Sequence, residues 1–172
     1  MIMVIWITGI SGAGKTTLAR HLIKNLKKNF IYFDGDQFRK IFNNDINYTL
    51  KSRDINAQRL TSLVKYLSDQ KHNIIVSANL TSFKYRKWCR KNIKDFIEIF
   101  ILAEIKNLIK RDYKKLYSNA LKKKIKNVVG IDIPFKIPKG SNIYIPNNKT
   151  KKDFLTKIDI IKKYIKEKKI KY

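Results

Sequence analysis

A glycine-rich segment directly after a short apolar run constrains this chain more than any other feature. The apolar run covers residues 2–7, and the segment reads Gly9-Ile10-Ser11-Gly12-Ala13-Gly14-Lys15-Thr16-Thr17. It fits the pattern G-x-x-x-x-G-K-[ST] and lies between a predicted strand and a predicted helix, as a phosphate-binding loop must. Glycines let successive backbone N–H groups turn toward one phosphate, and the following helix directs its positive end at the same anion. The sequence therefore predicts a site for a nucleoside triphosphate.

Two side chains of this loop extend the prediction to a metal ion. In such loops the lysine, here Lys15, reaches the β- and γ-phosphates, and the hydroxyl after it, here Thr16, ligates Mg²⁺. We therefore expect Mg²⁺ with ATP as the phosphoryl donor. The loop residues expected to bind ATP are Gly9, Ser11, Gly12, Ala13, Gly14, Lys15, Thr16 and Thr17.

Length and composition indicate one globular domain over residues 1–172. The chain is 44% hydrophobic and 12% aromatic, which is enough apolar material for a core. No apolar run approaches the roughly 20 residues of a membrane span, and no signal-peptide pattern is visible at the N-terminus. The lone cysteine, Cys89, cannot form an internal disulfide. We therefore expect a cytoplasmic protein without a membrane partner.

The net charge of +26 raises the question of nucleic-acid binding. Of the 39 basic residues only 7 are arginine, and the lysines are spread along the whole chain. A nucleic-acid surface would concentrate charge on one face, with arginine and aromatic residues interleaved. We therefore expect small nucleotide substrates and no specific nucleic acid, and we leave a homodimer open. Where lysine is the default cation, arginine marks positions that need a flat, bidentate charge. Four such positions lie within the motifs described below: Arg39, Arg53, Arg59 and Arg111.

Alternating apolar runs and amphipathic segments predict an α/β fold with a parallel sheet between helices. The predicted strands are 2–8, 30–33, 73–77, 96–102 and 142–145. The predicted helices are 15–28, 53–70, 82–92 and 150–168. A helical hairpin over 104–124 is interpreted as part of a mobile lid spanning about 104–127. We expect a P-loop kinase sheet of five strands in the order 2-3-1-4-5, with the active site at the carboxyl ends of the strands.

Five motifs in one order make the chain similar to a known family. It resembles adenylylsulfate (APS) kinases, P-loop kinases that phosphorylate the 3′-hydroxyl of adenosine 5′-phosphosulfate. Each motif alone is weak, but their combined order and spacing cover nearly the whole chain. The matching segments are 9–17, 33–39, 52–59, 111–117 and 128–136.

Phosphoryl transfer also needs an acid near the accepting hydroxyl. The strand that ends at Ser77 carries no acid, so Asp34 and Asp36, just past another strand, are the nearest substitutes. We expect Asp36 to orient or deprotonate the hydroxyl, or to hold the water shell of Mg²⁺. Lys15, Asp34 and Asp36 are thus the candidate catalytic residues.

The acceptor should be anionic, because cations gather in the motifs. Arg39, Arg53 and Arg59 offer three guanidinium groups, and Asn56 lies three residues from each of the latter two, on what we expect to be one shared helix face. Two further cations, Arg111 and Lys114, lie on the predicted lid, where they could close over ATP and the acceptor. The acceptor residues that the resemblance adds to this set are Tyr48, Leu80, Gly130, Ile131 and Phe135.

The departures from the family pattern concentrate on the base of the acceptor. Val128 stands where APS kinases have a phenylalanine that stacks on adenine, Asn79 replaces a second aromatic residue, and Lys136 replaces an acid. Stacking contributes about 1–3 kcal/mol per aromatic ring, so losing a ring while gaining an amide suggests a smaller or more polar base. Tyr48 or Phe135 would supply the remaining stacking face.

We consider three functions. We favour phosphorylation of cytidine diphosphoramidate, the reaction of an APS-kinase-like branch that serves phosphoramidate decoration of bacterial capsules, because of the altered base site. The alternative is the reaction that the resemblance implies, phosphorylation of APS in sulfate activation. A third reading, of another class, is a non-catalytic protein that binds nucleotides or nucleic acid through its basic surface.

Overall fold

A five-stranded parallel sheet carries the fold in the computed structural model, which describes residues 2–80, 82–112 and 115–170. The strand order is β2-β3-β1-β4-β5, which confirms the predicted order. All pairs are parallel, with Ile5 of β1 opposite Ile75 of β3 and Ile97 of β4. The strands are β1 (Val4–Thr8), β2 (Ile31–Asp34), β3 (Ile74–Ser77), β4 (Phe96–Leu102) and β5 (Ile143–Pro146).

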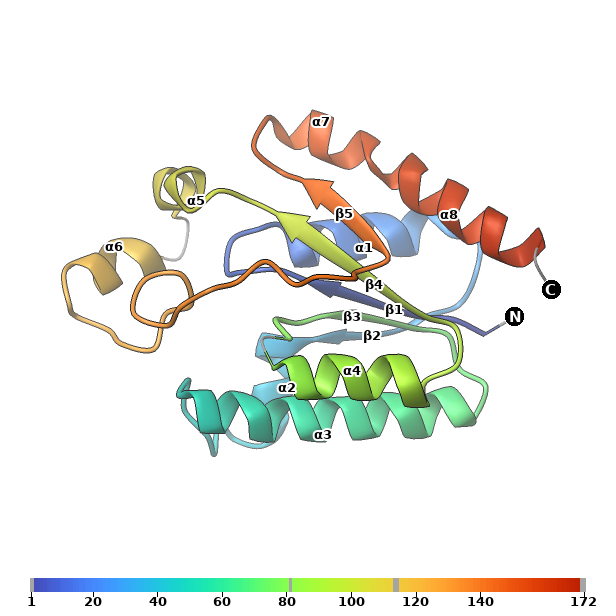
Figure 1. Cartoon of the computed structure of the whole chain (residues 1–172), viewed down its shortest axis with the longest axis horizontal. Coiled ribbons are helices and arrows are strands. Elements are labelled where there is room, and N and C mark those ends of the chain that lie inside the picture. Colours follow the sequence, from blue (N-terminus) through green and yellow to red (C-terminus); the bar gives the residue numbers. More distant parts are fainter. Residues whose placement is uncertain (1, 81, 113–114, 171–172) are drawn as a thin grey trace.

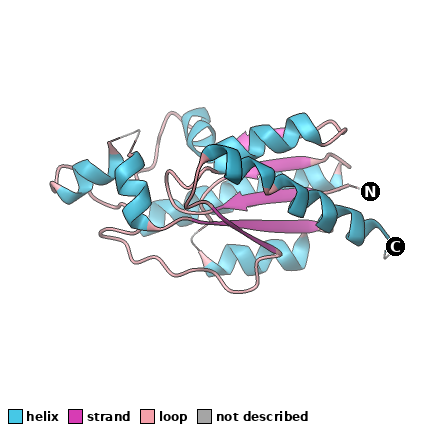
Figure 2. Ribbon diagram, turned by 90° about the horizontal axis from the view of Figure 1, so that it is seen from above, coloured by secondary structure: helices cyan, strands magenta, loops and turns pink. Residues whose placement is uncertain are grey.

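Helices cover both faces of the sheet, and alternate residues of each strand feed two separate cores. Ile5 and Ile7 pack in the core beneath α1 (Lys15–Asn25), α7 (Lys151–Thr156) and α8 (Ile158–Ile170). Val4 and Trp6 pack on the other face with α2 (Gly35–Ile41), α3 (Leu50–Asp69) and α4 (Phe83–Asn92). Figures 1 and 2 show these helices on either side of the strands. Burial on both faces explains why β1 and β3 are almost wholly apolar.

The structure corrects the sequence-based boundaries in two places. The short helix α2 was not predicted, because the Asp34-Gly35-Asp36 segment looked like a turn at a strand end. The Asp34 carboxylate instead accepts the backbone N–H groups of Asp36 and Gln37, and so caps a helix. The predicted helix 150–168 is two helices, α7 and α8, separated at Lys157. The apolar residues expected on its inner face are nevertheless all buried: Phe154, Ile158, Ile161 and Ile165.

The predicted lid segment contains two short helices, α5 (Ile105–Arg111) and α6 (Leu116–Leu121). They lie beyond the carboxyl ends of the strands, away from both chain termini (Figure 1). The Asp112 carboxylate accepts the backbone N–H groups of Tyr117 and Ser118 and so fixes the start of α6. Lys114 lies outside the described residues, and the mobility of this segment stays a prediction. None of the described helices is long and apolar enough to cross a membrane.

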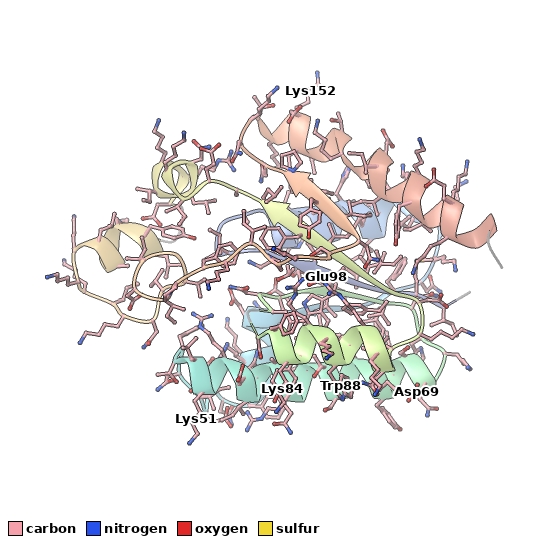
Figure 3. All side chains as sticks on the ribbon, in the orientation of Figure 1. Lys51, Asp69, Lys84, Trp88, Glu98 and Lys152 are labelled. Carbon is pink, nitrogen blue, oxygen red and sulfur yellow. The ribbon has the colours of Figure 1, made fainter. Side chains whose placement is uncertain are left out.

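One buried acid ties α4 to the sheet. Glu98 of β4 is fully buried and receives two hydrogen bonds from Arg86 of α4, at 2.5 Å to Oε1 and 2.9 Å to Oε2. Arg90 also donates to Glu98, and Arg86 donates to Ser141 at 3.2 Å. Glu98 lies between the sheet and α4 (Figure 3). A buried charge is tolerated only when it is paired and hydrogen-bonded, so this cluster should dominate the local energetics.

We expect Glu98→Gln to lower the free energy of unfolding by about 3–5 kcal/mol, because it leaves the Arg86 charge buried without a counter-charge. Urea denaturation followed by circular dichroism measures the change. The matched control is Asp69→Asn, which removes an exposed pair with Lys65 at the outer end of α3 (Figure 3). That control should lower the free energy of unfolding by less than about 1 kcal/mol. Equal losses in the two variants would contradict the assignment.

Candidate active site

The loop between β1 and α1 has the conformation of a phosphate cradle. Gly9, Gly12 and Gly14 all have positive φ angles, of 147°, 73° and 103°. At Gly14 a Cβ would also lie 2.9 Å from Asn147 Nδ2, so no side chain fits there. Lys15 Nζ donates to the Ile10 carbonyl oxygen at 3.0 Å, which folds the ammonium back over the loop. The predicted ATP-binding residues of this loop are thus brought together around one concave turn.

An oxygen pair suited to Mg²⁺ lies beside this loop. Thr16 Oγ1 donates to Asp34 Oδ2 at 2.8 Å, which joins the first turn of α1 to the end of β2. Magnesium prefers oxygen ligands and usually takes only one or two from the protein, with phosphates and waters completing its shell. No cluster of three or more His, Cys, Asp or Glu residues suited to a metal occurs in the described part of the chain. The Thr16–Asp34 pair therefore fits a magnesium ion that is held jointly with phosphates.

Asp34 has two more partners, which the sequence analysis missed. The hydroxyls of Ser77 and Tyr32 donate to Asp34 Oδ2 at 3.1 and 3.2 Å, and these two hydroxyl oxygens lie 2.7 Å apart. Strand register could have identified Ser77, because Asp34 and Ser77 are paired at the carboxyl ends of β2 and β3. Burial alone would raise the pKa of Asp34, but the hydrogen bonds from Thr16, from backbone N–H groups and from Ser77 lower it below its ordinary value. Asp34 is therefore ionised at neutral pH.

Asp36 lies in the first turn of α2, two residues past the end of β2. Its backbone N–H donates to Asp34 Oδ1 at 3.0 Å, and its side chain is exposed at this edge of the sheet. The intervening Gly35 is enforced by packing, because a Cβ there would lie 2.8 Å from the Cβ of Ala78. The two carboxylates are thus given different environments: Asp34 among hydroxyls and Asp36 toward solvent. This division suits Asp34 to the metal and Asp36 to a substrate hydroxyl.

Two arginines meet around Tyr48, Arg39 buried and Arg53 partly buried. Arg39 Nη1 donates to the Asn47 carbonyl oxygen at 3.0 Å, and its guanidinium carbon lies 4.7 Å from the Tyr48 ring centre. Arg53 donates to the carbonyl oxygens of Tyr48 and Asn127 at 2.9 and 2.8 Å, with its guanidinium carbon 5.5 Å from the same ring. The structure therefore brings Arg39, Tyr48 and Arg53 together, as the sequence predicted.

Neither of these guanidinium groups forms an ion pair with an acid within the described residues. Carboxylates act on them at longer range, those of Asp36 and Asp45 on Arg39 and those of Asp132 and Asp36 on Arg53. Burial lowers the pKa of both, and the charge of Arg39 lowers that of Arg53 further. Both stay protonated at neutral pH, because an arginine side chain keeps its charge in proteins. Two adjacent cations, one buried and one partly buried, are suited to bind an anion.

Asn56 adds an unsatisfied polar group on the same helix. Its side chain is 8% exposed, and its Oδ1 is the buried side-chain oxygen or nitrogen without a hydrogen-bond partner among the described residues. An unsatisfied buried acceptor costs about 1–3 kcal/mol. A hydrogen-bond donor from a ligand would remove that cost.

Arg59 has other partners than Arg39 and Arg53. It pairs with Asp45 at 2.8 Å and packs over the Phe42 ring at 4.5 Å. Arg53 and Arg59 each lie three residues from Asn56, so their side chains leave α3 about 60° to either side of it. A role of Arg59 at the acceptor stays a prediction. Arg59 fixes the loop that precedes α3.

The residues expected at the acceptor base are not equivalent in the structure. Val128 and Leu80 are buried in the two cores, Asn79 is partly exposed, and Tyr48 is 48% exposed. Phe135 stacks on Phe100 with 5.9 Å between ring centres, so one of its faces is already covered. Gly130 and Ile131 lie in the turn that follows Val128. The Asp132 carboxylate stabilises this turn by accepting the backbone N–H groups of Asn127 and Val128. The Tyr48 ring is therefore the accessible aromatic surface beside the arginines.

Arg111 contacts the segment after β5. Its Nη2 donates to the Lys149 carbonyl oxygen at 3.0 Å, which links the end of α5 to that segment. The segment lies on the α1 side of the molecule (Figure 1). Binding of ATP by Arg111 stays a prediction. The predicted acceptor residue Lys114 is outside the described residues.

Comparisons with known proteins agree with this geometry. The sequence model of the family described as adenylylsulphate kinase matches residues 1–146. A cytidine diphosphoramidate kinase of Campylobacter jejuni is 37% identical over 92% of this chain and 93% of its own. An adenylyl-sulfate kinase of Halothermothrix orenii is 34% identical over 84% of this chain and 80% of its own. The Mycobacterium tuberculosis APS kinase CysC, solved with AMPPNP and APS, superposes with a TM-score of 0.81 at 29% identity, covering 94% and 98% of the two chains.

We expect Asp36→Asn to lower kcat by at least ~10²-fold, because an amide cannot accept the proton of the substrate hydroxyl. Steady-state kinetics at saturating ATP measure the loss. Asp159→Asn, which alters an exposed acid of α8, should leave kcat unchanged. A defect confined to the KM for ATP or to the Mg²⁺ requirement would instead make Asp36 a ligand of the metal's water shell.

Proposed function

We propose a specific acceptor for this chain, which belongs to the adenylylsulphate kinase family and is an ATP-dependent kinase. That acceptor is the nucleotide cytidine diphosphoramidate. The reaction would transfer the γ-phosphoryl group of ATP to the 3′-hydroxyl of that nucleotide. The enzyme would act in the cytoplasm, and its product would serve phosphoramidate decoration of capsular polysaccharide. The C. jejuni relative supports this choice, but adenylyl-sulfate kinases are nearly as similar in sequence. The choice of acceptor therefore rests on the residues that would face its base.

On the donor side, the phosphate loop would bind ATP, with Lys15 at the β- and γ-phosphates and Arg111 toward the nucleoside. Thr16 and Asp34 would hold Mg²⁺, with Asp36 within reach of its water shell. When bound, the ion neutralises charge that develops on the transferred phosphoryl group. Asp36 would then orient the accepting hydroxyl.

On the acceptor side, Arg39 and Arg53 would bind the diphosphate-like group. This assignment is supported by the burial of Arg39, by the adjacency of the two groups around Tyr48, and by the absence of an ion pair between either of them and an acid among the described residues. Each guanidinium group donates hydrogen bonds to backbone carbonyl oxygens, and these bonds would fix its orientation before the ligand binds. Asn56 Oδ1 would accept a hydrogen bond from the same ligand.

The observation that carries the choice of base is the missing aromatic pair. Val128 is only 4% exposed and has no ring to offer, and Asn79 presents an amide where an aromatic residue would stack. One accessible ring, that of Tyr48, gives a single stacking face. Cytosine is smaller than adenine and carries an exocyclic amine and a ring carbonyl, both of which an amide can bind. This surface suits a pyrimidine better than a purine.

The second candidate is APS. The residues for phosphate and metal would serve it equally well, and the M. tuberculosis structure holds APS in the same fold. The third reading of the sequence, a non-catalytic nucleotide-binding or nucleic-acid-binding protein, is set aside because the relatives and the structural neighbours are kinases.

We expect kcat/KM with cytidine diphosphoramidate to exceed that with APS by at least ~10-fold, which corresponds to about 1.4 kcal/mol of discrimination. A coupled assay of ADP release with each acceptor measures the ratio. Higher kcat/KM with APS would show that this is an APS kinase with an altered base site.

A pair of variants tests whether Asn79 carries this preference. Asn79→Phe should raise kcat/KM with APS relative to the cytidine acceptor by at least about 5-fold, because it restores a stacking face. Asn79→Ala is the matched control, since it removes the amide without adding a ring. Asn79→Ala should lower kcat/KM with the cytidine acceptor and should not raise kcat/KM with APS. Identical acceptor ratios in both variants would exclude Asn79 as the determinant.

A further inference from the structure

Two side chains hold the phosphate loop from its outer side. The hydroxyl of Tyr117, on α6, donates to the Ser11 carbonyl oxygen at 2.7 Å. Asn147, just after β5, donates from Nδ2 to the Ala13 carbonyl oxygen at 2.8 Å. Neither residue was assigned a role by the sequence patterns. Both reach the loop from more than 100 residues away along the chain.

The geometry of the peptide group gives these bonds a consequence for the ligand. A trans peptide is planar, so its C=O and the N–H of the next residue point in opposite directions. Holding the Ser11 carbonyl outward therefore directs the Gly12 N–H inward. Holding the Ala13 carbonyl outward does the same for the Gly14 N–H. Inward N–H groups are what a phosphate cradle needs.

Both donors are fixed before any nucleotide binds. Tyr117 is 2% exposed, and burial raises the pKa of its phenol to about 12, so the hydroxyl keeps its proton. Asn147 is 6% exposed, and its backbone N–H donates to the Leu102 carbonyl oxygen at 2.7 Å. Gly14 leaves just enough space for the Asn147 amide. The two side chains thus act as rigid supports.

We propose that Tyr117 and Asn147 are positioning residues for ATP, which aim the Gly12 and Gly14 N–H groups at its phosphates without touching the nucleotide. Because Tyr117 lies on α6, the same bond links the position of the α5–α6 segment to the shape of the phosphate loop. This link concerns the donor site, so it holds whichever acceptor the enzyme uses.

Tyr117→Phe is the direct test, since it removes only the hydroxyl. Loss of one hydrogen bond should weaken ATP·Mg²⁺ binding by about 3- to 10-fold and raise the KM for ATP by the same factor. Affinity for adenosine, which has no phosphate, should change by less than about twofold. Isothermal titration calorimetry measures both affinities without any acceptor.

The matched control is Tyr144→Phe. The Tyr144 hydroxyl also donates to a backbone carbonyl at 2.7 Å, that of Pro138, and accepts the Ser141 N–H at 3.0 Å; both partners lie in the segment before β5 and not in the phosphate loop. This control should leave ATP affinity unchanged. A second variant, Asn147→Asp, keeps the size of the side chain but loses the donor, and should weaken ATP binding more than adenosine binding.

Unchanged ATP affinity in folded Tyr117→Phe would overturn the proposal. So would equal losses for ATP and adenosine, which would indicate a general structural defect. If Asn147→Asp does not fold, Tyr117→Phe alone decides, with circular dichroism confirming that the variant is native.

Discussion

The structure depends on the burial of β1 on both faces between β3 and β4. Both edges of β1 are paired with other strands, and its residues are buried on both faces. The loop at its carboxyl end is therefore surrounded by the ends of neighbouring strands. Asp34 and Ser77 end the two strands beyond it on one side, and Leu102 and Asn147 meet on the other. The residues proposed for the metal, the acid proposed for the acceptor and the supports of the phosphate loop all lie at the carboxyl end of this strand or of its neighbours. Glycine adopts the positive φ angles of the loop without a steric penalty, and the surrounding contacts restrict the freedom that glycine would otherwise have.

Much of the fold could be predicted from local patterns. The phosphate loop identified β1 and α1, and near-continuous apolar runs identified β3 and β4, which are buried on both faces. Shorter apolar runs identified the edge strands β2 and β5, which are partly exposed. The helix α2 escaped prediction because seven residues show too few turns of apolar periodicity to be distinguished from a loop. The break at Lys157 escaped because the apolar residues on both sides of it remain in phase and remain buried. Neither feature leaves a local signal.

Those candidate site residues that lie within one short motif could be predicted from the sequence. The phosphate loop, Asp36 and the pairing of Arg39 with Arg53 follow from short segments, although the meeting of the two arginines at Tyr48 needed the family pattern. Tyr32, Ser77, Tyr117 and Asn147 act through hydrogen bonds between distant segments, which no spacing rule reports. The ion pair of Arg59 with Asp45 is likewise a contact that spacing along the helix does not reveal.

The partners of the two acceptor arginines have a consequence for how such an enzyme changes over time. The hydrogen bonds of Arg39 and Arg53 within the described residues go to main-chain oxygens, those of Asn47, Tyr48 and Asn127. A main-chain oxygen persists whatever side chain its residue carries. Substitutions at positions 79 and 128, which make none of these contacts, would therefore leave the two guanidinium groups in their orientation. If these arginines bind the acceptor as proposed, point mutations at such positions would change the preference for a base and preserve the binding of phosphate.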